Sequence, residues 1–145
     1  MDEKKRCLES LQHIKKEHKK LLLAAELLVN GSATESEDVK NPSPCSFDQW
    51  SGNEALIKQR VGVQLFDKLT ALHKQWHTTY FKIIDIYFPK NKGLFGKLLS
   101  KKPSQLEIDK AKSYLDDLQR IADEFFKTLD ISERRIQALS DSKFC

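Results

Sequence analysis

Two histidines four residues apart, His73 and His77, are the first candidates for chemistry in this sequence. In an α-helix, residues at positions i and i+4 project from the same face, so both imidazole rings can reach a single metal ion. Two histidines at this spacing can also be core and boundary residues with ordinary hydrogen bonds. The pair alone therefore indicates half of a metal site and leaves that structural alternative open.

A third histidine, His18, occupies a position where an amphipathic helix normally carries an apolar residue. It falls between Leu11 and Leu22 in a series of positions that are three and four residues apart and apolar except at Lys15, which interrupts the series. A buried imidazole ring needs a polar partner, which either a metal ion or a backbone carbonyl can supply. His13 lies about 140° around the same helix, so we expect it to face solvent.

Cys45 is the fourth candidate, because it follows the proline-rich residues 42–44 directly and precedes two aromatic anchors, Phe47 and Trp50. Zn²⁺ prefers a tetrahedron of nitrogen and sulfur donors, which three histidines and one thiolate from a capping turn could supply. Free cysteine is also often a small buried apolar residue, and that alternative stays open. The predicted zinc ligands are His18, Cys45, His73 and His77.

These residues form three ordered motifs, His18–Leu21, Cys45–Trp50 and His73–His77. They match a His-x-x-aromatic-or-Leu element, a Cys-x-hydrophobic-Gly-x-aromatic element at every position but Asp48, and a His-x-x-x-His element. Because the three motifs occur in this order, the chain resembles the bacterial chemoreceptor zinc-binding (CZB) domain family over about residues 10–90. Asp48 departs from the pattern, because the family usually has glycine there; if the position needs a positive φ, aspartate is among the residues that tolerate it.

The resemblance implies a role as well as a ligand set. Domains of this family bind zinc and are associated with sensing zinc or a hypochlorite-type oxidant, in the regulation of chemotaxis or cyclic-di-GMP signalling. The family also suggests a homodimer, and the apolar spacing of the helices would permit one. Since we find no output region in this sequence, we expect a stand-alone regulatory domain whose signalling partner acts in trans.

The elements that must position these residues are helical. Alternating three- and four-residue steps between apolar positions predict helices over residues 3–29, 62–88 and 104–139, and Ser104 with Glu107 forms a capping-box pattern. Residues 45–50 form a short turn or helix in this interpretation, and residues 53–61 are ambiguous. We therefore predict a single all-α domain over residues 1–145, an antiparallel four-helix-type bundle of three long helices and one short element.

An enzyme is not expected. Four protein donors leave no open position on a zinc ion for an activated water, and no glutamate lies between His73 and His77 to act as a general base. Cys45 as a nucleophile activated by a histidine is a second alternative, but no third group that would orient the histidine is identifiable. A di-iron bundle needs more histidines and bridging carboxylates than the chain provides.

Composition and charge limit the partners. The formal net charge is +4, and the lysine runs lack the aromatic or groove-reading residues that a nucleic-acid surface needs. No signal peptide and no bilayer-spanning apolar run are present, so we expect a cytoplasmic protein without membrane insertion. With only three cysteines, a disulfide framework is not expected.

A metal-free helical interaction module remains as the main rival hypothesis. In that case the three seam histidines would be satisfied core residues. The apolar connection within residues 93–100, which contains Leu94, Phe95, Leu98 and Leu99, would then dock a partner. The same connection could instead close the end of the bundle or lie in a dimer interface.

Overall fold

The computed structural model describes residues 2–32, 45–88 and 103–139. Within these ranges the chain forms five helices and no strand, which confirms the all-α prediction. The helices are α1 (Asp2–Val29), α3 (Ser46–Ser51), α4 (Glu54–Val61), α5 (Val63–Tyr87) and α7 (Gln105–Ala138).

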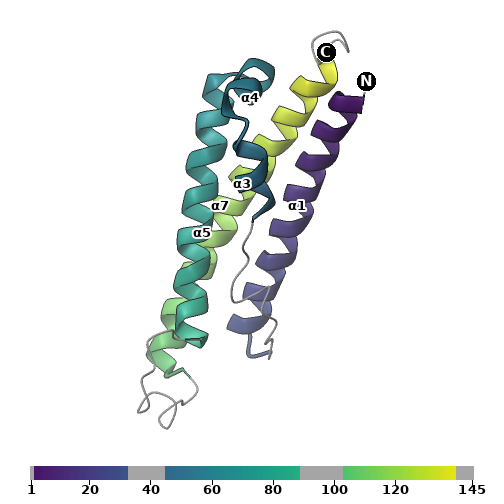
Figure 1. Ribbon diagram of the computed structural model, residues 1–145. Helices are drawn as coiled ribbons and strands as arrows, with labels where there is room; N and C mark the ends of the chain where they lie inside the picture. The colour runs from purple at the N-terminus through teal and green to yellow at the C-terminus, as the bar shows by residue number, and fades with distance from the viewer. Residues whose placement is uncertain (1, 33–44, 89–102, 140–145) are drawn as a thin grey trace.

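Three long helices form the body of the bundle, and the two short ones supply a partial fourth element (Figure 1). Helix α7 runs antiparallel to both α1 and α5 and packs against each of them more extensively than they pack against each other. Helix α3 lies across the front between α1 and α5, and α4 follows it at the end of the bundle where α5 begins. The predicted four-helix-type bundle is therefore confirmed, with α3 and α4 together in the short fourth position.

The helix ends follow from local chemistry. The hydroxyl of Ser104 accepts a hydrogen bond from the Glu107 amide and the Glu107 carboxylate accepts one from the Ser104 amide, which is the predicted capping box. Gly62, with φ of +93°, separates α4 from α5. A Cβ at this glycine would lie 3.0 Å from Arg135 Nη1, whose guanidinium donates to the Val61 carbonyl at 2.7 Å. The positive φ therefore favours glycine, and any larger residue would also press on the Arg135 guanidinium.

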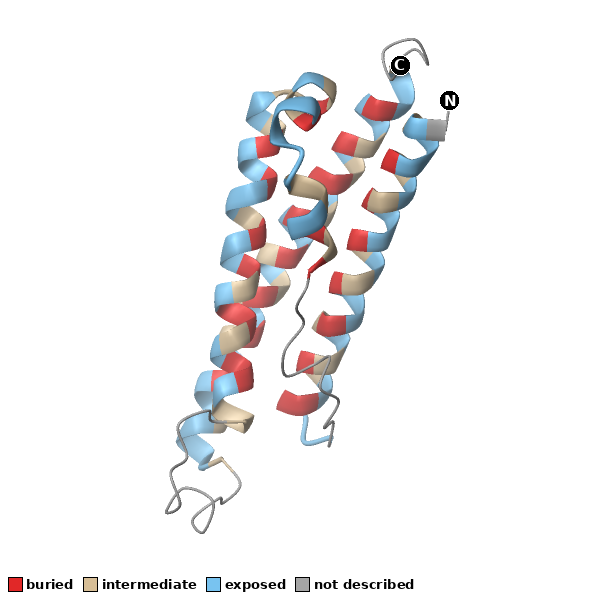
Figure 2. Ribbon diagram, in the orientation of Figure 1, coloured by how far each residue is buried: buried red, intermediate tan, exposed pale blue. Residues whose placement is uncertain are grey.

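The predicted apolar seams are mostly the buried faces of the helices (Figure 2). One detail of α1 was wrong: Lys15 does not interrupt the seam, because Ile14 fills that turn and is fully buried. Leu21 is buried where Leu22 was expected, and Leu22 is only half-buried. Lys15 instead forms an ion pair with Asp130 of α7.

Buried apolar residues form two clusters, one on each side of a polar layer. The first contains Leu11, Ile14, Leu69 and Phe125, and the second contains Leu21, Trp76, Tyr80 and Leu118, among others. On α1 and α5 the change from one cluster to the other occurs at His18 and His73. The histidines thus lie deep in the bundle, at the level where the apolar core is divided.

Some predicted features lie outside the described residues. These are the proline-rich residues 42–44 and the apolar connection at 93–100. None of the helices in the described ranges combines the length and the apolar character that crossing a bilayer requires.

Candidate metal centre

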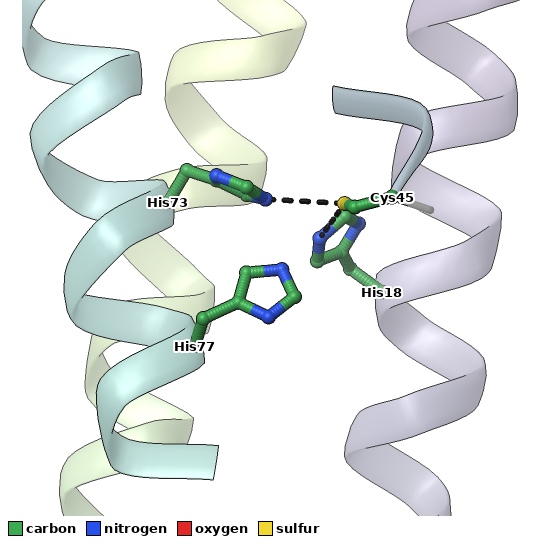
Figure 3. A group of neighbouring side chains, drawn as sticks. All are labelled: His18, Cys45, His73 and His77. Carbon is green, nitrogen blue, oxygen red and sulfur yellow. Dashed lines mark hydrogen bonds between the residues drawn. The ribbon is translucent and has the colours of Figure 1, made fainter. Parts of the chain in front are cut away.

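The structure brings all four predicted ligands together inside the bundle (Figure 3). His18 comes from the middle of α1, Cys45 immediately precedes α3, and His73 and His77 lie on successive turns of α5. One ligand atom of each residue can be chosen so that all four lie within 4.8 Å of one another. His18, Cys45 and His73 are buried and His77 is half-buried. This group could hold a metal ion.

The sulfur of Cys45 is the closest link between the segments. Its Sγ lies 3.2 Å from Nε2 of His73 and 3.6 Å from Nε2 of His18. Four donors at bond lengths of about 2.0 to 2.3 Å on a zinc tetrahedron lie roughly 3.3 to 3.8 Å apart. These two separations are thus already close to those that one tetrahedral ion requires.

His18 is oriented by its own helix. Its Nδ1 donates a hydrogen bond to the Ile14 carbonyl at 2.8 Å, which leaves Nε2 facing the sulfur without a proton in the neutral ring. Trp76 and Phe125 contact the ring edge-on from α5 and α7, with ring centroids 4.8 and 5.3 Å away. The histidine is therefore fixed by the long helices in the tautomer that can bind a metal through Nε2.

His73 is oriented largely by α3. Phe47 stacks on its ring with centroids 4.1 Å apart and an interplanar angle of 27°. Its outer nitrogen, Nδ1, lies 3.9 Å from the carboxylate oxygen Oδ1 of Asp48. Cys45, Phe47 and Asp48 thus contact the same imidazole ring at its inner nitrogen, its face and its outer nitrogen.

His77 completes the group from the next turn of α5. Figure 3 shows one ring nitrogen turned toward the other three side chains, and the ring centroid lies 4.4 Å from that of His73. Its Nε2 is buried and has no hydrogen-bond partner among the described residues. A buried polar atom without a partner is costly, and a metal ion would satisfy it. The donor set therefore fits a metal on this independent ground.

Helix α3 is held to α1 next to the cysteine. Glu17 Oε1 accepts a hydrogen bond from the Ser46 amide at 3.3 Å, and Phe47 is buried. No residue other than glycine has a positive φ in the described ranges, so Asp48 sits in α3 without backbone strain. Position 48 therefore has no left-handed backbone conformation that would require a glycine.

Burial controls the protonation of the donors. Desolvation lowers the pKa of His73 to about 3, with further lowering by His77 and His18. Desolvation likewise lowers the pKa of His77 to about 4 and lowers that of His18. Burial raises the pKa of the Cys45 thiol to about 11, although the amides of Phe47 and Asp48 at the start of α3 lower it. At neutral pH the metal-free centre therefore holds three neutral imidazoles and a thiol.

Two acidic residues next to the centre were not identified as functional from the sequence. Glu17 binds the start of α3 and lies 3.5 Å from Nε2 of His13, and Asp48 faces His73. Exposed acidic residues are common on helices, so these two do not stand out by type. The only signals in the sequence are that Glu17 directly precedes His18 and that Asp48 stands where the motif usually has glycine. His13 is 67% exposed, as predicted, and is not part of the cluster.

Comparisons with known proteins give no relative: no family model, no curated protein and no solved structure matches this chain.

Proposed function

We propose that this protein binds one Zn²⁺ ion through His18, Cys45, His73 and His77 and acts as a sensory or regulatory module. The proposal rests on one observation above all. Four nitrogen and sulfur donors from three separate segments converge in the core, and no carboxylate belongs to the group.

The donor types favour zinc over other divalent ions. Imidazole and thiolate are soft or borderline ligands, whereas Mg²⁺ and Ca²⁺ prefer oxygen. Three imidazoles and one thiolate also have the composition of a closed tetrahedral zinc site. When bound, zinc would hold the Cys45 sulfur as a thiolate and would give His77 Nε2 a partner.

A regulatory role follows from how the donors are distributed. Four protein donors leave no position for a reacting water, which argues against hydrolysis. Because the ligands come from α1, α5 and the start of α3, metal binding is coupled to the packing of these segments. Loss of zinc, or oxidation of the Cys45 thiolate, would remove the link between α3 and the two long helices. The resemblance to chemoreceptor zinc-binding domains supports a sensor of zinc or oxidant.

The metal claim is tested by measuring metals in the purified protein by mass spectrometry. We expect about one zinc per chain in the wild type, and an apparent affinity that falls sharply in Cys45→Ala and His77→Ala. His13→Ala removes an exposed histidine outside the centre and is the matched control. A wild-type protein that binds no zinc when zinc is supplied would overturn the proposal.

The regulatory claim needs a conformational readout. Hydrogen exchange should speed up at the amides of α3 when zinc is chelated or when a mild oxidant is added, and it should change little at the centres of α5 and α7. The same exchange pattern with and without zinc would identify a purely structural metal. Size-exclusion chromatography under both conditions tests the proposed homodimer, and pull-down with zinc-loaded and zinc-free protein tests a signalling partner in trans.

A further inference from the structure

Three residues at the start of α3, including its N-cap Cys45, contact the His73 ring from different sides. The Cys45 sulfur lies 3.2 Å from Nε2, and the Phe47 ring stacks on the imidazole face. The Asp48 carboxylate lies 3.9 Å from Nδ1 at the opposite edge of the ring. Sulfur and carboxylate therefore bracket the two nitrogens of one imidazole.

We propose that Asp48 is a positioning residue of the metal centre, which holds the proton of His73 on Nδ1 and directs Nε2 to the metal. This inference rests on the proposed zinc binding. It assigns a role to the residue at which the chain departs from the motif of the family it resembles.

The tautomer of His73 decides which of its two nitrogens can bind a metal. A neutral imidazole carries one proton, so the nitrogen that binds a metal cannot also hold it. His73 Nε2 faces the sulfur and the other donors, whereas Nδ1 faces Asp48. A carboxylate accepts hydrogen bonds and does not donate them when ionised, so it stabilises the Nδ1–H form. That form is the one that can bind the metal through Nε2.

The charge of the occupied centre acts in the same direction. Zn²⁺ with three neutral imidazoles and one thiolate carries a net charge of about +1 in a largely apolar core. A bound metal draws electron density from the imidazole and makes Nδ1–H a stronger donor, so the attraction to Asp48 grows on metal binding. Asp48 is 70% exposed and can move the short distance from 3.9 Å into hydrogen-bond range.

His18 and His73 differ in what orients them. The Nδ1 of His18 already donates to the Ile14 carbonyl of its own helix, so its orientation does not depend on α3. Among the described residues, His73 is the only ligand whose outer nitrogen faces a carboxylate within 4 Å. Asp48 therefore acts on one particular ligand, and it does so from the same short helix that follows Cys45.

The test compares the zinc affinities of wild type, Asp48→Asn and Asp48→Glu by competition with a chromophoric chelator. We expect Asp48→Asn to weaken zinc binding about tenfold, at the lower end of the effect of outer-shell partners because Asp48 is partly exposed. Asp48→Glu should recover most of the loss, since it restores the carboxylate. Asp67→Asn removes the same charge from the exposed face of α5 and serves as the matched control.

A second measurement reports the tautomer directly and does not require the metal. Two-bond ¹H–¹⁵N correlation spectra identify the protonated nitrogen of each histidine. The Nδ1–H form of His73 should dominate in the metal-free wild type and decrease in Asp48→Asn, while His18 remains unchanged in both. This readout separates a specific effect on His73 from a general loss of folding.

The outcomes are distinct. If Asp48→Asn binds zinc as tightly as wild type, or if Asp48→Glu is as weak as Asp48→Asn, the assigned role of the carboxylate is wrong while the zinc site stands. If the wild type binds no zinc, the proposed function itself fails, and the role of Asp48 as a metal-positioning residue fails with it. A tenfold loss that glutamate reverses, with a shifted His73 tautomer, supports the inference.

Discussion

His18 and Cys45 lie side by side in the centre, but very different amounts of structure hold them in place. His18 sits in the middle of a 28-residue helix, donates to the carbonyl of Ile14, and is surrounded by rings from α5 and α7. Cys45 precedes a six-residue helix whose only buried residue is Phe47. A helix of this length has little stability of its own, because nucleation is costly and few hydrogen bonds repay it.

The difference indicates which part of the centre depends on the metal. The histidines project from long helices whose packing is provided by two apolar clusters, so their positions do not need an ion. Helix α3 is fixed by Phe47, by the hydrogen bond from Ser46 to Glu17 and by the donor atom of Cys45. A metal ion would therefore join a locally weak segment to a preformed surface, which is the arrangement that a switch requires.

The largest expected effect comes from truncating two phenylalanines that are both fully buried, one in α3 and one in the long helix α7. Phe125→Ala removes a side chain shared by the long helices and should lower the free energy of unfolding by about 3–5 kcal/mol. Phe47→Ala should cost less in global unfolding, because it releases α3 while the long helices remain packed. Chemical denaturation of the metal-free proteins checks the difference. Equal losses for the two variants would mean that α3 is an integral part of the cooperative core.

Removing either Cys45 or His18 should weaken zinc binding. Only the loss of His18 should also lower the stability of the metal-free protein. Cys45→Ala and His18→Ala should each lower the affinity by more than about 100-fold, which exceeds the typical effect of an outer-shell residue. In the presence of a chelator, His18→Ala should melt at a lower temperature than wild type because it leaves a cavity among aromatic rings. Cys45→Ala should melt nearly as wild type does.

A further variant controls for the cavity. His18→Leu fills the core position with an apolar side chain and removes the buried polar ring, so its metal-free form should be at least as stable as wild type. It should bind zinc no better than His18→Ala. If His18→Leu kept tight zinc binding, His18 would not be a ligand.

The sequence predicted the donors better than their surroundings, and the reason is physical. A histidine at an apolar seam position is rare enough to stand out, and the placement of the histidines on helices follows from spacing alone. Cys45 stood out because it lies between prolines and two aromatic residues. The α1 seam was misplaced at Lys15 because helical periodicity permits a step of either three or four residues. Only the position of α7, which pairs Lys15 with Asp130 and buries Ile14, decides between them.

Helix α4 and the contacts of the acidic residues were not predicted, for a related reason, whereas the short element that became α3 was. The eight residues of α4 are mostly good helix formers, but a helix of this length between Gly52 and Gly62 is marginal on its own, so the burial of Ile57 and Val61 decides its conformation. The approach of Asp48 to His73 depends on how α3 meets α5, a contact between residues 25 positions apart. Local sequence carries no information about such a distance.

Lowering the pH should destabilise the metal-free protein through the histidines on the long helices. Below pH 6.5 the unfolded chain takes up protons on these residues, whereas folded His73 and His77 stay neutral down to pH of about 3 and about 4. The stability of the metal-free protein should therefore be greatest above pH 6.5 and should fall as the pH is lowered toward 4. From pH 6.5 to 5 the loss is at most about 2 kcal/mol per histidine.

Denaturation of the chelator-treated protein at several pH values measures this loss. His73→Leu should flatten the pH dependence, whereas His13→Gln, which removes an exposed histidine, should not. A wild-type stability that stays constant between pH 7 and 5 would show that the histidines are not held neutral by burial.

The smallest expected effect is the number of protons released when zinc binds. This number distinguishes the histidine donors from the cysteine donor. At pH 7 to 9 the histidines of the metal-free centre are already neutral, but the Cys45 thiol, with a pKa of about 11, still carries its proton. Zinc must displace that proton, so binding should release about one proton per site. The apparent zinc affinity should then rise about tenfold per pH unit in this range.

Calorimetric titration of zinc in buffers with different ionisation enthalpies gives the number of protons directly. Release of none would mean that Cys45 is a thiolate before the metal binds, and that the amides of Phe47 and Asp48 outweigh burial. Release of two would mean that a histidine is charged in the metal-free protein, against its apolar surroundings. Release of one identifies Cys45 as the only donor that the metal must convert, and this donor belongs to the segment with the least structure of its own.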